Sequence, residues 1–440
     1  MSEQTNPADE LDARLERMAG VLLPKRDEAV QYRSASGVER RWREDQNAFE
    51  GLDSTNSRNA MIDYATGEAW IGKNSNEPRR SKVIVNIIRG KCNTAEGRFS
   101  EIMLPTDDQN WGIKPTPIPD NVVGLPPEAA APMAVQAPQP QPSTPGGAAA
   151  QPAAQPEAID PRAAELAKRL EVAKKKAAGM EKEIDDQLNE CEYNAECRKV
   201  IRSAVRLGTG VLKGPNVVKR VQKAWVEQSD EQGTVYVMDS AEKLAPASRC
   251  VDIWNVFPDP HCGDNPKRGA FLWEKDDHML PRDLRALIGV PGYSTRQIRK
   301  ILAEEPLRTV VQVDKGGEQQ VQHTSVSKGN PYERWEYHGD VDREDLEAMG
   351  VTVPDEETQA FSACVVFVND RPIKVQLNTL DTGELPYDFF QWEQVADSPW
   401  GIGEPRKIMW QQRIITAAWR AMMDNAGDSA GAQIVMSAEC

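Results

Sequence analysis

The most informative part of this sequence is "SPWGIGEPRKIMWQQRIITAAWRAMMDNAGDSAG", residues 398 to 431. Its pattern predicts a helix on which Arg406, Arg413 and Arg420 line one stripe, because they repeat every seven residues. Apolar residues cover most of the remaining surface: Ile408, Trp410, Ile414, Ile415, Ala418, Trp419, Ala421, Met422 and Met423. A helix apolar over so wide an arc needs burial on more than one side, so we expect neighbours on both flanks. The alternative is a central helix of an ordinary monomeric domain.

Length and charge limit the classes of protein to consider. The chain has 440 residues, of which 39% are hydrophobic and 6% aromatic, and this is enough for two or three folded domains. With 53 Lys and Arg against 68 Asp and Glu, the net charge is -15. This balance argues against a protein that holds nucleic acid by neutralising phosphates. It is compatible with DNA that slides past without binding tightly.

Cysteine usage and the first residues bear on the cellular compartment. The seven cysteines are scattered and never form a CxxC pair, so neither a disulfide framework nor a zinc module is predicted. The segment "MSEQTNPADELDARLERMAG" lacks the basic start and apolar core of a signal peptide, and no apolar run approaches the ~20 residues that span a bilayer. We therefore expect a soluble, intracellular protein.

The first 158 residues divide into a helical and a low-complexity part. Residues 1–124 read as mostly helical, with Leu11, Leu15 and Met18 at spacings of four and three. Residues 125–158 contain nine Pro and eleven Ala and no aromatic, Lys or Arg residue. Such a segment buries too little apolar surface to offset its ordering entropy, so we predict a disordered insert; the alternative is a proline-rich ligand for a peptide-binding domain.

A long amphipathic helix is expected next. Asp160 and Pro161 are typical of a helix start, and apolar residues then recur at spacings of three and four as far as Leu207. If continuous, the helix has 47 residues and a length of about 70 Å. We expect it to bridge layers, to pack along a neighbouring chain, or to break near Gly179.

The rest of residues 159–400 reads as alternating strands and short helices. Two hairpins are predicted, one around the turn "SDEQ" at 229–232 and one around "NDR" at 369–371. Short helices are expected at 281–288 and 295–306. The predicted fold class is therefore α+β: a mostly helical N-terminal part with a long amphipathic helix, antiparallel hairpins in the middle, and an apolar C-terminal helix.

Two motifs offer chemistry, and both favour a plain structural interpretation. "GEAWIGKN", residues 67–74, satisfies G-x-x-x-x-G-K but has Asn74 where a phosphate loop needs Ser or Thr, and a polar loop follows it instead of a helix. A group of possible metal ligands consists of Asp259, His261, Cys262, Asp264, Asp277 and His278. Its spacing matches no zinc pattern, so we predict a turn that closes a strand. We predict no enzymatic activity, no cofactor and no metal.

Four segments carry a resemblance to a known family. They are residues 83–119, 179–215, 254–260 ("WNVFPDP") and 385–436. The sequence there resembles the portal proteins of short-tailed (podovirus-type) bacteriophages, and the likeness extends from about Asn59 to Met436 apart from the Pro/Ala insert. The last segment is the most specific, because its Trp, Gly and Met pattern is hard to reach by composition alone.

The resemblance implies a function and a set of partners. Portal proteins form a dodecameric ring at one capsid vertex, through which DNA is packaged and later ejected. The implied partners are the terminase large subunit, the major capsid and scaffolding proteins, a tail adaptor, and double-stranded DNA in transient, non-specific contact. The implied location is the virion, with assembly in the host cytoplasm and no membrane involved.

The resemblance also implies roles for individual segments. Residues 1–124 and 159–400 correspond to the wing, 401–427 to the first stem helix and 428–440 to the start of the clip. Arg406, Arg413 and Arg420 are expected to face the channel or an acidic neighbour. The residues expected to pack between helices are Trp400, Trp410, Trp419 and Met422. If Trp419 is a core residue, its replacement by Ala should lower the free energy of unfolding by ~3 kcal/mol or more.

One departure from the family leaves rival interpretations open. Family members continue into a full clip, a second stem helix and a barrel or crown, so this chain corresponds to a portal truncated before most of the clip. The first stem helix should then expose an apolar face. One rival is a monomeric scaffold or adaptor whose apolar helix binds one partner helix. The other is a packaging enzyme such as a terminase ATPase.

Overall fold

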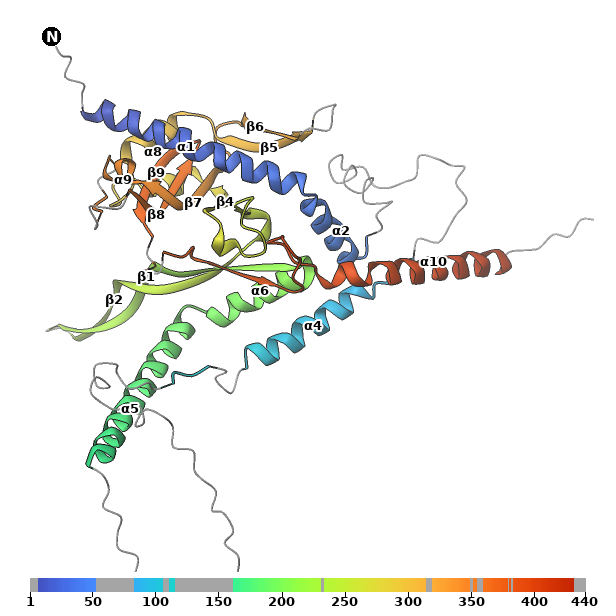
Figure 1. Cartoon of the computed structure of the whole chain (residues 1–440), viewed down its shortest axis with the longest axis horizontal. Coiled ribbons are helices and arrows are strands. Elements are labelled where there is room, and N and C mark those ends of the chain that lie inside the picture. Colours follow the sequence, from blue (N-terminus) through green and yellow to red (C-terminus); the bar gives the residue numbers. More distant parts are fainter. Residues whose placement is uncertain are drawn as a thin grey trace, which may run out of the picture. The chain divides into compact units, whose positions relative to one another are not determined.

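The computed structural model describes residues 7–52, 83–105, 111–114, 161–230, 233–313, 319–348, 351–353, 359–378, 380 and 383–430 (Figure 1). The chain forms two compact units, one of residues 1–104 with 191–440 and one of residues 105–190. Helices and antiparallel sheets are both abundant, so the predicted α+β class is confirmed. The motif at 67–74 and the Pro/Ala insert at 125–158 lie outside the described residues.

The larger unit begins with helices whose buried faces follow the sequence pattern. Helix α1 spans Pro7–Ala35, α2 spans Val38–Glu50 and α4 spans Ile88–Met103. Between α1 and α2 the chain turns at Gly37, whose φ of 72° suits glycine. The α1 residues Leu15 and Met18 are buried against a sheet, as their spacing predicts, and Leu22 is buried beside them. The side chain of Leu11, the third residue of the predicted pattern, lies outside the described part of the structure.

The strands within the described ranges form three antiparallel sheets. A five-stranded sheet has the order β3-β4-β7-β8-β9, a three-stranded sheet has the order β10-β1-β2, and β5 pairs with β6. The bounds are β1 Thr209–Asp230, β2 Gly233–Val251, β3 Val256–Pro258, β4 Phe271–Met279, β5 Leu307–Val313, β6 Gln319–Ser325, β7 Tyr332–Asp342, β8 Ala360–Val368, β9 Arg371–Leu377 and β10 Tyr387–Gln391.

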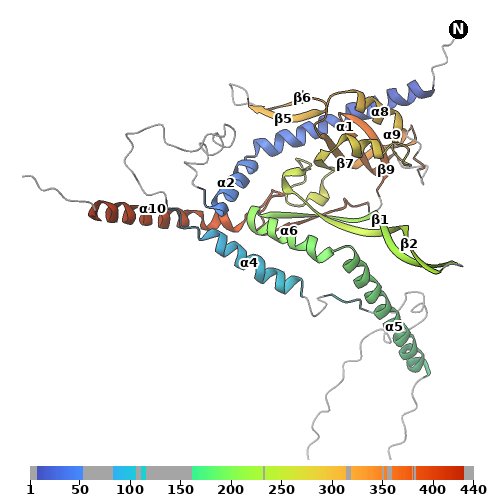
Figure 2. The same ribbon diagram turned by 180° about the vertical axis from the view of Figure 1, so that it is seen from behind.

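Short helices connect these strands, and α10 follows the last of them. They are η3 Ile253–Asn255, η4 Pro266–Arg268, α7 Pro281–Ala286, α8 Thr295–Ala303 and α9 Arg343–Ala348. Helix α10 spans Glu404–Ala430. It points away from the five-stranded sheet, on the side of the larger unit that lies farther from β9 (Figures 1 and 2). No helix in the described ranges is both long and apolar enough to cross a bilayer.

Aromatic residues form the two main cores of the larger unit. On the five-stranded sheet, Trp273 contacts Tyr337 and Phe367, and the helix α1 covers this cluster. In the second core, the Trp42 ring of α2 lies 5.0 Å from that of Trp400. Such edge-to-face pairs add to the stability that burial itself provides.

The long helix predicted from Pro161 to Leu207 is interrupted at a different place from the one expected. Helix α5, in the smaller unit, spans Pro161–Glu190, and α6, in the larger unit, spans Tyr193–Leu207. The interruption falls at Glu192, which is left-handed with φ 56°, and Gly179 stays inside α5. One glycine costs a helix only about 1 kcal/mol, so Gly179 is tolerated inside α5. The interruption at Glu192 instead allows α6 to turn its apolar face toward the core; this face consists of Val200, Ile201, Ala204 and Val205.

Three further segments differ from what their local sequence suggests. The β5–β6 hairpin was not predicted, because β6 reads "QQVQHTS" and is exposed at most positions. The segment "CVDIWNVF", residues 250–257, has the apolar content of one strand but is divided: β2 ends at Val251, and Asp252 then caps the short helix η3 by accepting from the Trp254 N–H. In the smaller unit, residues 111–114 contain no strand, and the Ile113 N–H donates to Glu181 at 2.6 Å.

Candidate subunit interface on helix α10

The first turns of α10 are joined to α2 by Arg406. Its guanidinium lies 2.9 Å from the Glu44 carboxylate and 3.0 Å from Asp45, and it donates to the Arg41 carbonyl at 3.1 Å. Burial raises the pKa of Asp45 to about 6, against the opposing effect of the Arg406 and Arg41 charges. Arg406 therefore has acidic neighbours, and they belong to its own chain.

A second polar contact joins α10 to the start of α4. The buried Gln412 side chain accepts from the N–H groups of Ile87 and Ile88, at 3.0 Å each, and donates to the Ala48 carbonyl at 3.1 Å. It thus satisfies N–H groups that the beginning of a helix leaves without a partner. Sequence reasoning missed Gln412; two adjacent amides, Gln411 and Gln412, interrupt the apolar pattern, and the structure buries the second of them.

Trp400 precedes α10 and is a core residue. Only 3% of it is exposed, and its ring contacts Trp42 and Phe389. It therefore packs against α2 and β10 of the same chain.

Five other large apolar residues of α10 remain exposed in the part of the chain that the structure describes. On a helical wheel at 100° per residue, the buried Met409, Gln412 and Thr416 occupy one narrow sector. The exposed residues are distributed around roughly 220° of the helix. They are Trp410 at 67%, Ile414 at 68%, Trp419 at 42%, Met422 at 60% and Met423 at 43% exposure. We call these five residues the α10 apolar surface.

Arg413 and Arg420 lie beside this surface and make local contacts. The Arg413 guanidinium lies 5.0 Å from the centre of the Trp410 ring, and Arg420 donates to the Val83 carbonyl at 3.0 Å. The three arginines of the predicted stripe are thus in three settings: an ion pair, a cation–π contact and a backbone contact.

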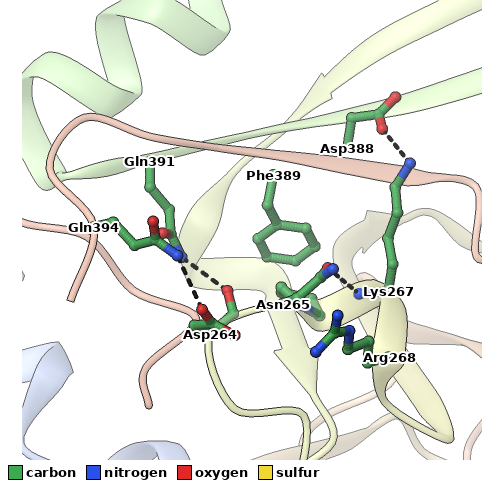
Figure 3. Close-up of a pocket in the computed structure, with 9 residues that line it drawn as sticks. Asp264, Asn265, Lys267, Arg268, Asp388, Phe389, Gln391 and Gln394 are labelled. Atoms are coloured by element: carbon green, nitrogen blue, oxygen red, sulfur yellow. Dashed lines mark hydrogen bonds and ion pairs between the residues drawn. The ribbon is translucent and has the colours of Figure 1, made fainter. Parts of the chain in front are cut away.

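A polar cavity of about 460 Å³ lies between the loop before β4 and the strand β10 (Figure 3). Lys267 pairs with Asp388 at 2.6 Å, and Gln394 donates to the Asp264 carboxylate at 3.0 Å. The Phe389 ring lies between these two pairs (Figure 3). The polar groups of these pairs satisfy one another, so the cavity by itself indicates no ligand.

Of the possible metal ligands, residues 259–264 lie in turns, whereas Asp277 and His278 belong to the strand β4. The Asp259 carboxylate accepts from the N–H groups of His261 and Ala270, both at 2.9 Å. The His278 side chain is largely exposed. These contacts correspond to the turn interpretation of the motif.

A different set of metal-binding atoms meets inside the protein. Ligand atoms of Glu336, His338 and Cys364 lie within 4.8 Å of one another, and theirs is the single such group in the described ranges. The Lys213 ammonium already occupies the position of a cation, 2.5 Å from the Glu336 carboxylate. Burial also raises the pKa of Cys364 far above its usual value, which keeps the thiol protonated. The group therefore fits a buried ion network better than a metal site.

Comparison with known proteins adds no assignment. A scan against models of protein families found no match, and a search of curated proteins found no related sequence.

Proposed function

We propose that this chain is a structural, non-enzymatic subunit of a portal ring, the head-to-tail connector through which a phage genome is packaged and ejected. The observation that carries the proposal is the α10 apolar surface, because five large apolar side chains around one helix need partners on more than one side. A ring supplies such partners, since head-to-tail contacts bury two different faces of each subunit.

The acidic composition supports the same proposal. A net charge of -15 provides few strong binding sites for phosphates, which suits a conduit through which DNA must move. In this proposal α10 is the first stem helix, and Trp410, Trp419 and Met422 pack between neighbouring copies. Arg413 and Arg420 border the channel or an acidic neighbour.

The proposal includes partners and a location. A portal ring of this kind, expected to be a dodecamer, meets the terminase large subunit, the major capsid and scaffolding proteins and the tail adaptor, and DNA passes through it transiently. It is a component of the virion at the capsid vertex, and it assembles in the host cytoplasm.

Light scattering after size-exclusion chromatography tests the proposal, with negative-stain imaging of the same fractions. We expect a closed ring near twelve subunits at micromolar concentration. Replacing Trp410 and Ile414 together with Ser should raise the concentration needed for assembly at least tenfold. Tyr32→Ser is the matched control, because Tyr32 is an exposed aromatic residue on α1, and it should assemble normally. A chain that stays monomeric at every concentration would contradict the ring.

The alternative from the same observation is a monomeric adaptor whose α10 binds one partner helix. It predicts a monomer alone and a one-to-one complex with its partner. The packaging-ATPase alternative depends on residues 67–74, outside the described residues. ATP hydrolysis that Lys73→Ala abolishes would favour it.

A further inference from the structure

The strands β1 and β2 form a ribbon that extends well beyond the sheet to which they belong (Figures 1 and 2). Their pairing runs from Val211 opposite Val251 to Asp230 opposite Gly233, with an irregularity between Lys213 and Asn216. The third strand, β10, pairs only with residues 209–213. From Asn216 onward the ribbon therefore has two strands, and a two-stranded ribbon is at best marginally stable in water unless it packs on something.

The register of the ribbon brings its largest apolar residues to one face. Trp225 lies opposite Met238, and Val221 lies opposite Glu242. Directly opposed residues share a face, and every second residue along a strand returns to it. One face therefore carries six large apolar residues, each between 50% and 70% exposed: Val217, Val221, Trp225, Tyr236, Met238 and Leu244. We call these six residues the ribbon stripe.

The apolar residues of the opposite face are smaller, because the register places only valines and alanines there among the apolar residue types. Two exposed valines, Val218 and Val226, belong to this opposite face, and no exposed aromatic residue of the described ribbon does. Asp239 and Ala241 are exposed on the same side. This asymmetry is typical of a sheet that is covered on one side and solvated on the other.

The apolar area of the ribbon stripe is the size that a protein interface needs. Two aromatic and four aliphatic residues exposed to this degree present roughly 350–600 Å² of surface. A standard interface buries about 800 Å² on each partner, of which slightly more than half is apolar. The ribbon stripe can thus provide most of the apolar part of one side of an interface.

The chemistry of the stripe favours a protein partner over a lipid surface. Four charged residues, Lys219, Lys223, Glu227 and Glu242, share the face that carries the stripe. A protein surface can offer partners to an ammonium and a carboxylate, whereas acyl chains cannot, and burying an unpaired charge is costly.

The length of the ribbon is sufficient to reach a neighbouring subunit. Residues 216–230 at about 3.3 Å each extend roughly 50 Å. The larger unit has about 350 residues, and a folded unit of that size has a radius of gyration near 20 Å and hence a width of about 53 Å. The distal ribbon is therefore about as long as one such unit is wide.

We propose that the β1–β2 ribbon is an assembly arm, whose stripe packs on an adjacent copy of this chain. This inference rests on the proposed ring. Each subunit of a closed head-to-tail ring needs two different contact surfaces, and the α10 apolar surface and the ribbon stripe are two separate apolar surfaces of one folded unit. The arm adds a contact layer distinct from that of α10.

The test is photo-crosslinking with a benzophenone amino acid at position 225. Val226 is the matched control position, because it is the next residue on the same strand, half exposed and on the opposite face. Rings are assembled from equal amounts of unlabelled and nitrogen-15 chains, and cross-linked peptides are identified by mass spectrometry. We expect mixed-isotope cross-links from position 225, at least fivefold more abundant than from position 226.

The outcomes separate the arm from the ring. If rings form but position 225 gives only same-isotope cross-links, or none, the stripe is covered by its own chain or by nothing, and the arm inference is wrong while the ring stands. If no ring forms at any concentration, the proposed function fails and the arm fails with it. As a second measurement, Trp225→Ser should raise the assembly concentration about tenfold and leave the urea midpoint of the dissociated chain nearly unchanged.

Discussion

The Lys213 ammonium lies 2.8 Å from the Glu274 carboxylate, and both side chains are 3% exposed. This ion pair joins β1 of the three-stranded sheet to β4 of the five-stranded sheet. Glu336 contacts the same ammonium, and the Tyr387 hydroxyl donates to Glu274 at 2.6 Å. Buried charges need such complete pairing, since the loss of one partner leaves the other without compensation.

Replacing Lys213 with Met should therefore lower the free energy of unfolding by about 3–5 kcal/mol. The change removes the positive charge between Glu274 and Glu336 while keeping a side chain of similar length. Urea denaturation at pH 7 measures the effect. Lys267→Met is the matched control, because its pair with Asp388 is exposed and should contribute less than about 1 kcal/mol. Equal effects of the two substitutions would contradict the structural role of the buried pair.

The same cluster should make stability depend on pH through His338. Burial lowers the pKa of His338 below its usual 6.5, against an opposing hydrogen bond with Glu336. The unfolded state therefore takes up the proton first, and the free energy of unfolding should fall as pH drops below about 6.5. For the uptake of one proton, the free energy of unfolding can change by at most about 1.4 kcal/mol per pH unit. His338→Gln should flatten this dependence between pH 7 and 5, whereas the exposed control His278→Gln should leave it unchanged.

Glu336 extends that dependence to more acid pH. Burial alone would raise the pKa of Glu336, but the hydrogen bond with His338 and the charge of Lys213 hold it well below 4.5. Its contribution to stability is therefore complete above pH 4.5 and lost as the pH falls through the lowered value. Unfolding curves of the His338→Gln variant should still show a loss of stability in this lower range.

Arg406→Gln should destabilise the junction of α2 and α10 by about 1–3 kcal/mol at pH 8, because it leaves the buried Asp45 carboxylate without its pair. The effect should be smaller at pH 5, where Asp45, with a pKa of about 6, takes up a proton. Urea denaturation at both pH values measures it. Arg413→Gln, which alters the same arginine stripe without touching α2, should cost less than about 0.5 kcal/mol. A pH-independent loss would contradict the assigned contact.

Replacing Gly208 with Ala should lower the free energy of unfolding by about 2–4 kcal/mol. Gly208 ends α6 with φ +93°, and a Cβ there would overlap the backbone carbonyl of Gly401, just before α10. Gly97→Ala is the control, because Gly97 lies inside α4 and a Cβ there meets no other atom within 4 Å. That change should raise the thermal midpoint, by the equivalent of about 0.5–1 kcal/mol. Two losses of similar size would show that the close approach of the two backbones has no special cost.

Trp400 and Trp419 should respond differently to replacement by Ala. Trp400 is a core residue, so its loss should cost about 3–5 kcal/mol in the dissociated chain. Trp419 remains 42% exposed in the dissociated chain. Its replacement by Ala should therefore weaken assembly by the ~3 kcal/mol expected of a core position, and should change the stability of the dissociated chain little. Thermal unfolding of the dissociated chain, compared with the assembly concentration, separates the two cases. A large loss for Trp419→Ala in the dissociated chain would indicate that α10 packs within one subunit.

Local sequence pattern was sufficient for much of the architecture. The spacing of Leu15 and Met18 predicts part of the buried face of α1, and the α10 periodicity predicts a helix apolar on most sides. Turn residues such as "NDR" mark the β8–β9 hairpin. These features depend on residues close together in the chain, where periodicity and turn preference act directly.

Other features were determined only by tertiary structure. Glu192 interrupts the long helix because α6 must turn its apolar face to the core, and no local signal marks that residue. The cluster of Lys213, Glu274 and Glu336 comes from three strands far apart in sequence, so its electrostatics follow from the pairing of sheets. Which α10 residues stay exposed was likewise decided by α2 and α4, which cover one narrow sector of the helix. Periodicity shows that a face is apolar, but burial depends on which elements the fold brings against it.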